Sequence, residues 1–401
     1  MKPLFVKSAI VTLALIGCVV SVFGQGDETV QGGQEPEGLV ITAGRTESKQ
    51  QEDGSFIKQY SGEVHARARS RDAELFADVA EYDSRIAEVR FSGHAVFRDS
   101  TRNLFADTLV YFERRGDVEA TGNVAVVELD RSFWADRVTY LKNDRLVVAA
   151  GNVLIRDDSL RATITGTRAV FNDSTGSGIV AGNPVLVRED PQGGILTVTC
   201  RDTLEVIRPQ QVARLWDGVT ITQDSLVARS SYAWYEGKRD LFTLTGNPEG
   251  NHVMHDTLGD DDVMLRAVST VRGDTIRVYL EDSEVRWVEV VGGCVSTTDW
   301  EDSTGALYSR SILESSEIRL DMADDRISMI TAGGMAKSYY FQNERDDEDM
   351  FVNEATGDTL RFFFEEGRIA RLRISGTGGA GARGKYYEYA PADTAAVGPA
   401  Q

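Results

Sequence analysis

Apolar and polar residues follow one pattern in three stretches of the chain that start 29 residues apart. The stretches read LFADVAEYDSRIAEVRFSGHAVF (75–97), LFADTLVYFERRGDVEATGNVAV (104–126) and FWADRVTYLKNDRLVVAAGNVLI (133–155). Each contains two apolar runs separated by a polar turn. The second run alternates with period two, which is typical of a strand and not of a helix. A fixed period of this size indicates a stacked repeat architecture.

One face of the second predicted strand carries only apolar residues and glycine in all three repeats. Successive side chains of a strand point to opposite faces, so these positions line one surface. The apolar members of this inward column are Val89, Phe91, Ala95, Phe97, Val118, Ala120, Val124, Val126, Val147, Ala149, Val153 and Ile155. Two interpretations are open, a packed core or an apolar groove. The small residues Ala95, Ala120 and Ala149 favour the groove.

The column also contains a glycine at the same place in each repeat, at Gly93, Gly122 and Gly151. Glycine inside a strand usually marks a bulge, a bend or the close approach of another backbone. Three such glycines in register predict a sheet that folds over along one line. We therefore expect an all-β, antiparallel, folded-over repeat sheet.

The pattern continues beyond the three clean repeats. Further repeats are predicted around positions 182, 217 and 246, and then around Gly292, Gly333 and Gly376. Residues 60–64 read as a partial first repeat. We expect a β-repeat domain over 56–256 and a second β-repeat block over 257–380 that continues the same sheet.

The two ends of the chain have a different character. Residues 1–24 read as a signal peptide, with Lys2 and Lys7 before an apolar segment too short to span a bilayer. A lipoprotein signal with Cys18 as the lipidated residue and an uncleaved membrane anchor are the alternatives. Residues 25–55 are predicted to be a flexible lead-in and 381–401 a disordered tail.

The charge balance argues against two kinds of partner. The formal net charge is −20, which argues against nucleic acid and against docking onto an anionic membrane through a basic patch.

Two cysteines remain outside the leader, Cys200 and Cys294. They could pair in an oxidising compartment, but the sequence leaves this open.

No catalytic or metal site emerges from the sequence. His252 and His255 are three residues apart, which places them on opposite faces of a strand. The acidic runs Asp260–Asp262 and 346–349 lack the alternating ligands of a calcium loop. No nucleophile or nucleotide motif is present. We therefore expect no enzyme activity, no metal and no cofactor.

The repeated motif resembles a known family. Ala77-Asp78, Ala106-Asp107 and Ala135-Asp136 each precede a tyrosine by four residues, and Gly-Asn-Val follows in the second and third repeats. This pattern is similar to the OstA-like, or LptA-like, family of periplasmic lipopolysaccharide-transport proteins. The first repeat departs from it, with Gly93-His94-Ala95. The resemblance implies an antiparallel twisted β-jelly roll that is open along one side and holds acyl chains inside.

The resemblance also implies a function and partners. We expect a non-enzymatic periplasmic protein whose inward column contacts the acyl chains of lipopolysaccharide or a related lipid and which passes them towards the outer membrane. Other OstA-like proteins, or a second copy in a homo-oligomer, would stack on it edge strand to edge strand. The alternative is a structural or scaffolding β-repeat protein that pairs through its edges without carrying lipid.

Overall fold

The structure is a computed structural model that describes most of the chain between residues 39 and 389. The described ranges are 39–68, 73–98, 103–159, 161–172, 174–189, 194–223, 225–258, 263–281, 284–323, 326–343, 350–365, 368–376 and 383–389. The predicted signal peptide, Cys18 and both acidic runs lie outside them.

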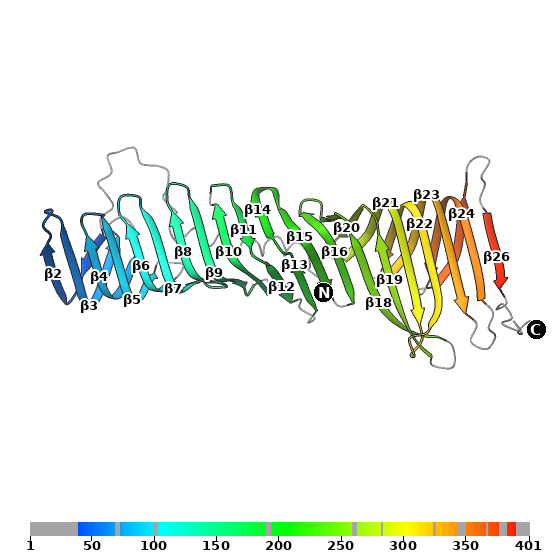
Figure 1. Ribbon diagram of the computed structural model, residues 1–401, viewed down its shortest axis with the longest axis horizontal. Helices are drawn as coiled ribbons and strands as arrows, with labels where there is room; N and C mark the ends of the chain where they lie inside the picture. Colours follow the sequence, from blue (N-terminus) through cyan, green and yellow to red (C-terminus); the bar gives the residue numbers. More distant parts are fainter. Residues whose placement is uncertain are drawn as a thin grey trace, which may run out of the picture. The chain divides into compact units, whose positions relative to one another are not determined.

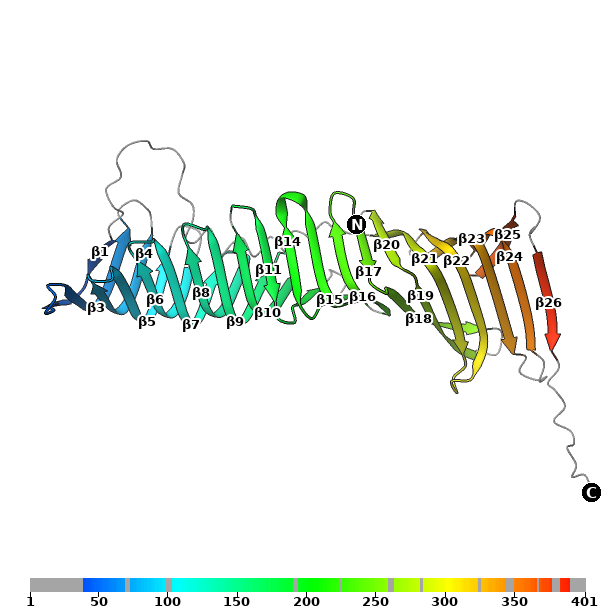
Figure 2. The same ribbon diagram turned by 45° about the horizontal axis from the view of Figure 1, so that its top comes forward.

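The described residues form 26 strands and one short 3-10 helix, η2 (Arg208–Gln210), and the strand pairs are antiparallel. Figures 1 and 2 show the strands following one another in chain order within each part of the chain. Their bounds are β1 (Leu39–Thr42), β2 (Arg45–Gln50), β3 (Phe56–Ala68), β4 (Glu74–Asp83), β5 (Glu88–Arg98), β6 (Asn103–Phe112), β7 (Asp117–Val127), β8 (Arg131–Leu141), β9 (Leu146–Asp157), β10 (Ala162–Asn172), β11 (Ser177–Ala181), β12 (Val185–Glu189), β13 (Ile195–Thr199), β14 (Thr203–Ile207), β15 (Val212–Gln223), β16 (Leu226–Glu236), β17 (Leu241–Thr245), β18 (Glu249–Leu258), β19 (Val263–Arg272), β20 (Thr275–Glu281), β21 (Glu284–Glu301), β22 (Leu307–Ala323), β23 (Arg326–Asn343), β24 (Met350–Glu365), β25 (Arg368–Ser375) and β26 (Arg383–Tyr389).

The chain divides into two compact units. The N-terminal unit contains the described residues up to 219 together with 235–238, and the C-terminal unit contains 220–234 and the described residues from 239 onward. The division therefore falls earlier than the boundary at 256/257 that the spacing of the repeats predicts.

The predicted bend is present in every clean repeat. Gly93, Gly122 and Gly151 have φ values of 76°, 76° and 75°, and the residue after each also has a positive φ. The strand register shifts at each of these points, for example between Ser92 and Ala95. Two consecutive left-handed residues turn the strand sharply, and glycine, followed by asparagine, adopts this conformation most readily. We call each such pair a corner.

The corners recur in both units, where glycine pairs with different neighbours. Gly246 has φ 74° and Gly292 has φ 84°. Two of the sequence predictions are wrong in detail. The corner expected at Gly333 is at Gly334 (φ 79°), and Gly376 lies directly after β25 and is not among the described glycines with positive φ.

An aspartate from the preceding strand fills each corner of the clean repeats. The side chain of Asp107 lies against the Cα of Gly122, where a Cβ would overlap its carboxylate. Asn123 donates to Asp107 Oδ2 over 3.1 Å. Asp78 and Asp136 stand in the same place beside their own corners. The aspartate and glycine of the repeated motif are therefore structural partners.

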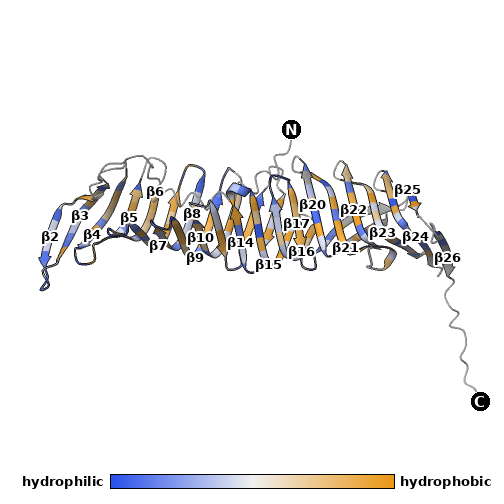
Figure 3. Cartoon of the chain, turned by 90° about the horizontal axis from the view of Figure 1, so that it is seen from above, coloured by the Kyte–Doolittle hydropathy of each residue, from blue (hydrophilic) through white to orange (hydrophobic). Residues whose placement is uncertain are grey.

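Both ends of the repeat region differ from the predictions. Residues 39–42 and 45–50, predicted to belong to a flexible lead-in, form β1 and β2. Residues 383–389, predicted to belong to a disordered tail, form β26. Figure 3 shows β2 in hydrophilic colours along its length, and all six of its residues are exposed.

Candidate functional site

The interior of the N-terminal unit is the candidate site. Its corners divide the strands into two layers. The turn layer holds the strand halves beside the tight turns at 84–87, 113–116 and 142–145, and the loop layer holds the halves on the other side of the corners. In each layer the inward positions form rows that run from strand to strand.

Every member of the central row of the turn layer is apolar or aromatic. Directly opposed residues lie about 5 Å apart and pack on the same face of the sheet. The row contains Tyr60, Ala80, Phe91, Leu109, Ala120, Val138, Ala149, Ala169, Val180, Leu204 and Leu215. Figure 3 shows hydrophobic segments recurring on these strands.

The loop layer has a corresponding row, and none of its members carries a charge. It contains Ala66, Leu75, Phe97, Leu104, Val126, Phe133, Ile155, Ile164, Leu186 and Val198. Apolar surface in the two layers is therefore continuous over ten or more strands.

Eleven of the twelve residues of the predicted inward column are buried. Phe91 and Ala95 are 0% exposed, and Val118, the least covered of the eleven, is 9% exposed. Phe97 is half-buried. These side chains have almost no solvent-accessible surface, so the two layers are closed over them. The small alanines do not leave an open trough, which corrects the groove predicted from residue size.

The alternate strands supply an equal set of interior residues that the column omits. Examples are Leu109 of β6 and Val138 of β8, which are 3% and 1% exposed. The signal was present in the first apolar run of each repeat, where an Ala-Asp pair is followed by a tyrosine. Because the aspartate-glycine corner falls within that run, its period-two alternation is interrupted and is less apparent.

The constant spacing of the motif tyrosines places them beside the tight turns. Tyr82, Tyr111 and Tyr140 face inward in the turn layer, each opposite a valine. Tyr140 is 2% exposed, and the hydroxyl of Tyr82 donates to Glu113 Oε2 over 3.3 Å. Burial raises the pKa of Tyr82. These rings cover the apolar rows from the side of the turns.

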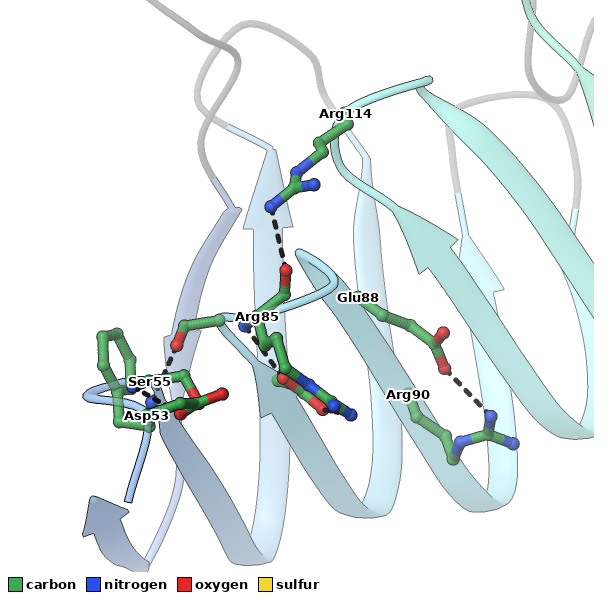
Figure 4. A network of polar contacts seen from close by, with 9 residues as sticks. Asp53, Ser55, Arg85, Glu88, Arg90 and Arg114 are labelled. Atoms are coloured by element: carbon green, nitrogen blue, oxygen red, sulfur yellow. Dashed lines mark hydrogen bonds and ion pairs between the residues drawn. The ribbon is translucent and has the colours of Figure 1, made fainter. Parts of the chain in front are cut away.

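Hydrogen bonds to backbone carbonyls connect neighbouring turns along each edge. At the turn edge, Glu113 N donates to the carbonyl of Ala87 over 2.9 Å, and Arg114 Nη2 donates to the carbonyl of Arg85 over 2.9 Å (Figure 4). At the loop edge, Asp158 N donates to Asp130 O over 2.9 Å. Each layer is thus held together at its own edge by hydrogen bonds between neighbouring turns, and the two layers share a continuous backbone at the corners.

One buried ion pair lies on the inner side of the loop edge. Asp157 is 0% exposed, and its Oδ2 lies 3.3 Å from Nε of Arg131. Ser159 Oγ donates to Asp157 Oδ1 over 2.5 Å. A carboxylate removed from water is tolerated only when its ion pair and hydrogen bonds compensate the lost hydration, and here the Arg131 partner stays 28% exposed. The apolar rows therefore end at a polar boundary on this side.

Other candidate chemistry can be assessed in the described residues alone. These contain no group of three or more metal-ligating side chains, and no helix among them is long and apolar enough to cross a bilayer. Cys200 and Cys294 are free and buried, so the disulfide that the sequence left open is not formed. Burial raises the pKa of the Cys200 thiol to about 11.

Comparison with known proteins does not assign the chain to a family. No protein-family model matches the chain, and no curated protein matches it. Among solved structures, the chain is similar to LptH of Pseudomonas aeruginosa, described as the LptA-homologous periplasmic component of the lipopolysaccharide transport device, with 13% identity. The match covers 44% of this chain and 85% of LptH, with a TM-score of 0.15. A match at this level carries no argument, and the fold rests on the strand pairing described above.

Proposed function

We propose that the N-terminal unit holds the acyl chains of lipopolysaccharide or a related lipid between its two layers, and that the protein passes this lipid across the periplasm towards the outer membrane without catalysis. The supporting observation is that hydrogen bonds hold each layer together at its own edge, while the two layers are joined to each other through the backbone at the corners. Parting them would break side-chain packing while leaving the strand ladders intact. The uninterrupted apolar rows would then face the lipid.

Burial of an acyl chain could release enough free energy to offset the loss of packing between the layers. Each buried methylene contributes about 0.8 kcal/mol, so a chain of about twelve methylenes gains roughly 10 kcal/mol gross. Part of this offsets the packing between layers that is lost on opening. Apolar contacts are non-directional, so an acyl chain could move from one pair of strands to the next.

The charge of the protein bears on which part of the lipid is recognised. A formal net charge of −20 disfavours a phosphorylated head group. Recognition would therefore depend mainly on the acyl chains, and the head group would stay outside the layers. The signal peptide predicted for residues 1–24 supports export to the periplasm.

A photo-crosslinking residue at two adjacent positions of β7 tests this proposal in cells. Val124 faces inward and is 1% exposed, whereas Ala125 pairs with Phe105 and Trp134 on the opposite face. Lipid adducts at position 124 and not at 125 are expected. The pair Val153 and Leu154 of β9 provides a second test if position 124 does not tolerate the substitution. Absence of adducts at both inward positions in folded protein would contradict the proposal.

A structural or scaffolding role is the second candidate, and the burial of the column favours it. In that case the interior is filled by the protein's own side chains, and the function lies in edge strands that pair with other OstA-like proteins or with a second copy. β1 carries the apolar residues Leu39, Val40 and Ile41, while β2 is polar and exposed throughout. Charged edges resist pairing, so β1 is the better candidate. Capture of a partner without bound lipid would favour this function.

A further inference from the structure

The inner face of the C-terminal unit differs in chemistry from that of the N-terminal unit. One row crosses six strands, from β18 and β19 through β21, β22 and β23 to β24, and every residue in it is polar. The strand register places His252, Ser269, Thr298, Ser311, Tyr340 and Asn353 directly opposite one another in this order. We call this set the polar row.

The polar row lies on the same face as the core of this unit. Ala267 and Leu313, which are 0% and 8% exposed, are each two residues away from a member of the row along their strands. Residues two apart on a strand share a face. A position equivalent to apolar rows in the N-terminal unit is therefore occupied by hydroxyl, amide, phenol and imidazole groups.

The two flanking rows mix polar and apolar side chains. Their polar members are Ser296, Ser338, Ser309 and Gln342, and Val271, Leu313, Ala355, Ala267 and the indole of Trp300 stand among them. None of the described side chains in these three rows is Asp, Glu, Lys or Arg, although the chain has a formal net charge of −20. The surface offers hydrogen-bond donors and acceptors without formal charge.

The row is partly accessible, since Tyr340 and Asn353 are exposed and its other four members are half-buried, and it retains hydrogen-bonding capacity. Tyr340 is 38% exposed, and its hydroxyl contacts Gln342 Oε1 over 3.2 Å. The hydroxyls of Ser269 and Thr298 lie 2.9 Å apart. A hydroxyl has one donor and two acceptor sites, so this single bond leaves both groups able to bind a ligand.

From this chemistry we infer that the polar row binds a neutral saccharide. Sugars present many hydroxyls without charge, and the C–H faces of their rings pack on aromatic side chains such as Tyr340 and Trp300. The row spans five strand spacings, about 24 Å at about 4.8 Å per spacing, which suits an extended oligosaccharide. The saccharide could be free or could be the head group of a glycolipid.

Matched variants on the two faces of the same strands provide the test. Thr298→Val with Tyr340→Phe removes two hydroxyls from the polar row and adds no charge. Thr297→Val with Tyr339→Phe makes the same chemical change on the opposite face, where Thr297 lies opposite Ile312 and Tyr339 stacks on Phe341. Because both changes are conservative, the inward and outward doubles should fold alike.

Calorimetric titration of the full chain with three probes distinguishes the sources. Maltohexaose is a free neutral saccharide, dodecyl maltoside joins a neutral disaccharide to a chain, and dodecylphosphocholine has the same chain without sugar. We expect the inward double to bind maltohexaose at least tenfold more weakly, and the outward double to bind it like the wild type. Loss restricted to dodecyl maltoside would assign the row to a tethered saccharide.

Two results would overturn the inference. One is that neither saccharide probe binds the wild-type protein. The other is that the inward and outward doubles weaken binding equally. Binding of dodecylphosphocholine reports acyl binding alone, so failure of the proposed lipid function would be seen separately from failure of saccharide binding.

Discussion

The side-chain amide of Asn152 donates to Oδ2 of Asp136 over 3.0 Å, from the corner of one strand to the strand before it. The same bond joins Asn123 to Asp107 over 3.1 Å one repeat earlier. In the first repeat His94 takes this place, with Nδ1 3.1 Å from Asp78 Oδ2. In each clean repeat a side-chain contact therefore connects the corner to the preceding strand, at the point where the strand pairing is interrupted.

Replacing the exceptional histidine should strengthen its corner. His94 has φ 49°, and asparagine suits this left-handed conformation because its short side chain bonds locally. We expect His94→Asn to raise the free energy of unfolding by about 0.5 kcal/mol, measured by urea denaturation. Asn123→His is the reverse change at a neighbouring repeat and should lower it. Equal effects of both changes would argue against a role for the amide.

The corner glycine should resist substitution more than a glycine in an open turn. In Gly122→Ala the new Cβ meets both a φ of 76° and the carboxylate of Asp107. We expect a loss of about 3 kcal/mol, because backbone strain of about 1–2 kcal/mol adds to displacement of the aspartate.

Gly54→Ala is the control for this substitution. Gly54 has φ 84°, and no other atom lies within 4 Å of the place that an alanine Cβ would occupy there. This change should cost about 1 kcal/mol from the backbone alone. Equal losses at Gly54 and Gly122, determined by thermal or chemical denaturation, would show that the aspartate contact is unimportant.

Breaking the buried ion pair should be costly. Asp157→Ala removes the carboxylate that lies 3.3 Å from Arg131 Nε, at a site where Asp157 is fully buried and the Arg131 side chain is 28% exposed. Loss of one partner of a buried pair costs about 3 kcal/mol. Asp158→Ala removes the adjacent carboxylate, whose side chain is 56% exposed and pairs with Arg156. It should cost less than about 1 kcal/mol, and urea denaturation of the two variants compares them directly.

The Cys200 thiol should react slowly. Its pKa is raised to about 11 by burial, so only a small fraction is thiolate at pH 8, and thiolate is the reactive form. Alkylation by iodoacetamide, followed on the Cys200 peptide by mass spectrometry, should accelerate strongly in concentrated urea. Fast alkylation of the folded protein at pH 8 would contradict this.

The same shift predicts a direction for stability against pH. The folded-state pKa lies above the value of about 8.5 for an unfolded cysteine. The contribution of this thiol to stability is therefore complete below about pH 8.5 and is lost as the pH rises towards about 11. Cys200→Ser should flatten this part of the stability profile.

Much of the N-terminal unit could be predicted from its sequence. The corner positions follow because two consecutive left-handed residues select glycine and asparagine, and the inward column follows because a strand has period two. The ambiguity at Gly333 arose because two glycines stand side by side there, and either satisfies the pattern. The polar strand β2 gave no periodic signal at all, since all of its side chains are exposed.

The state of the interior could not be predicted in the same way. Whether Ala95 or Ala120 faces a void depends on side chains from the other layer, which are distant in sequence and have no fixed spacing from them. The sequence pattern also missed the polar row. Its members, such as Thr298 and Ser311, are opposite one another only once the strand register is known.

Each aspartate and its corner lie inside a single 29-residue repeat, as Asp107 and Gly122 show. An in-frame removal or duplication of one repeat therefore cuts no such partnership. It changes the N-terminal unit by two strands, or about 9.6 Å. The number of repeats therefore sets the length of the unit. A distance between two binding partners could be adjusted by adding or removing repeats in the gene, with no new fold required.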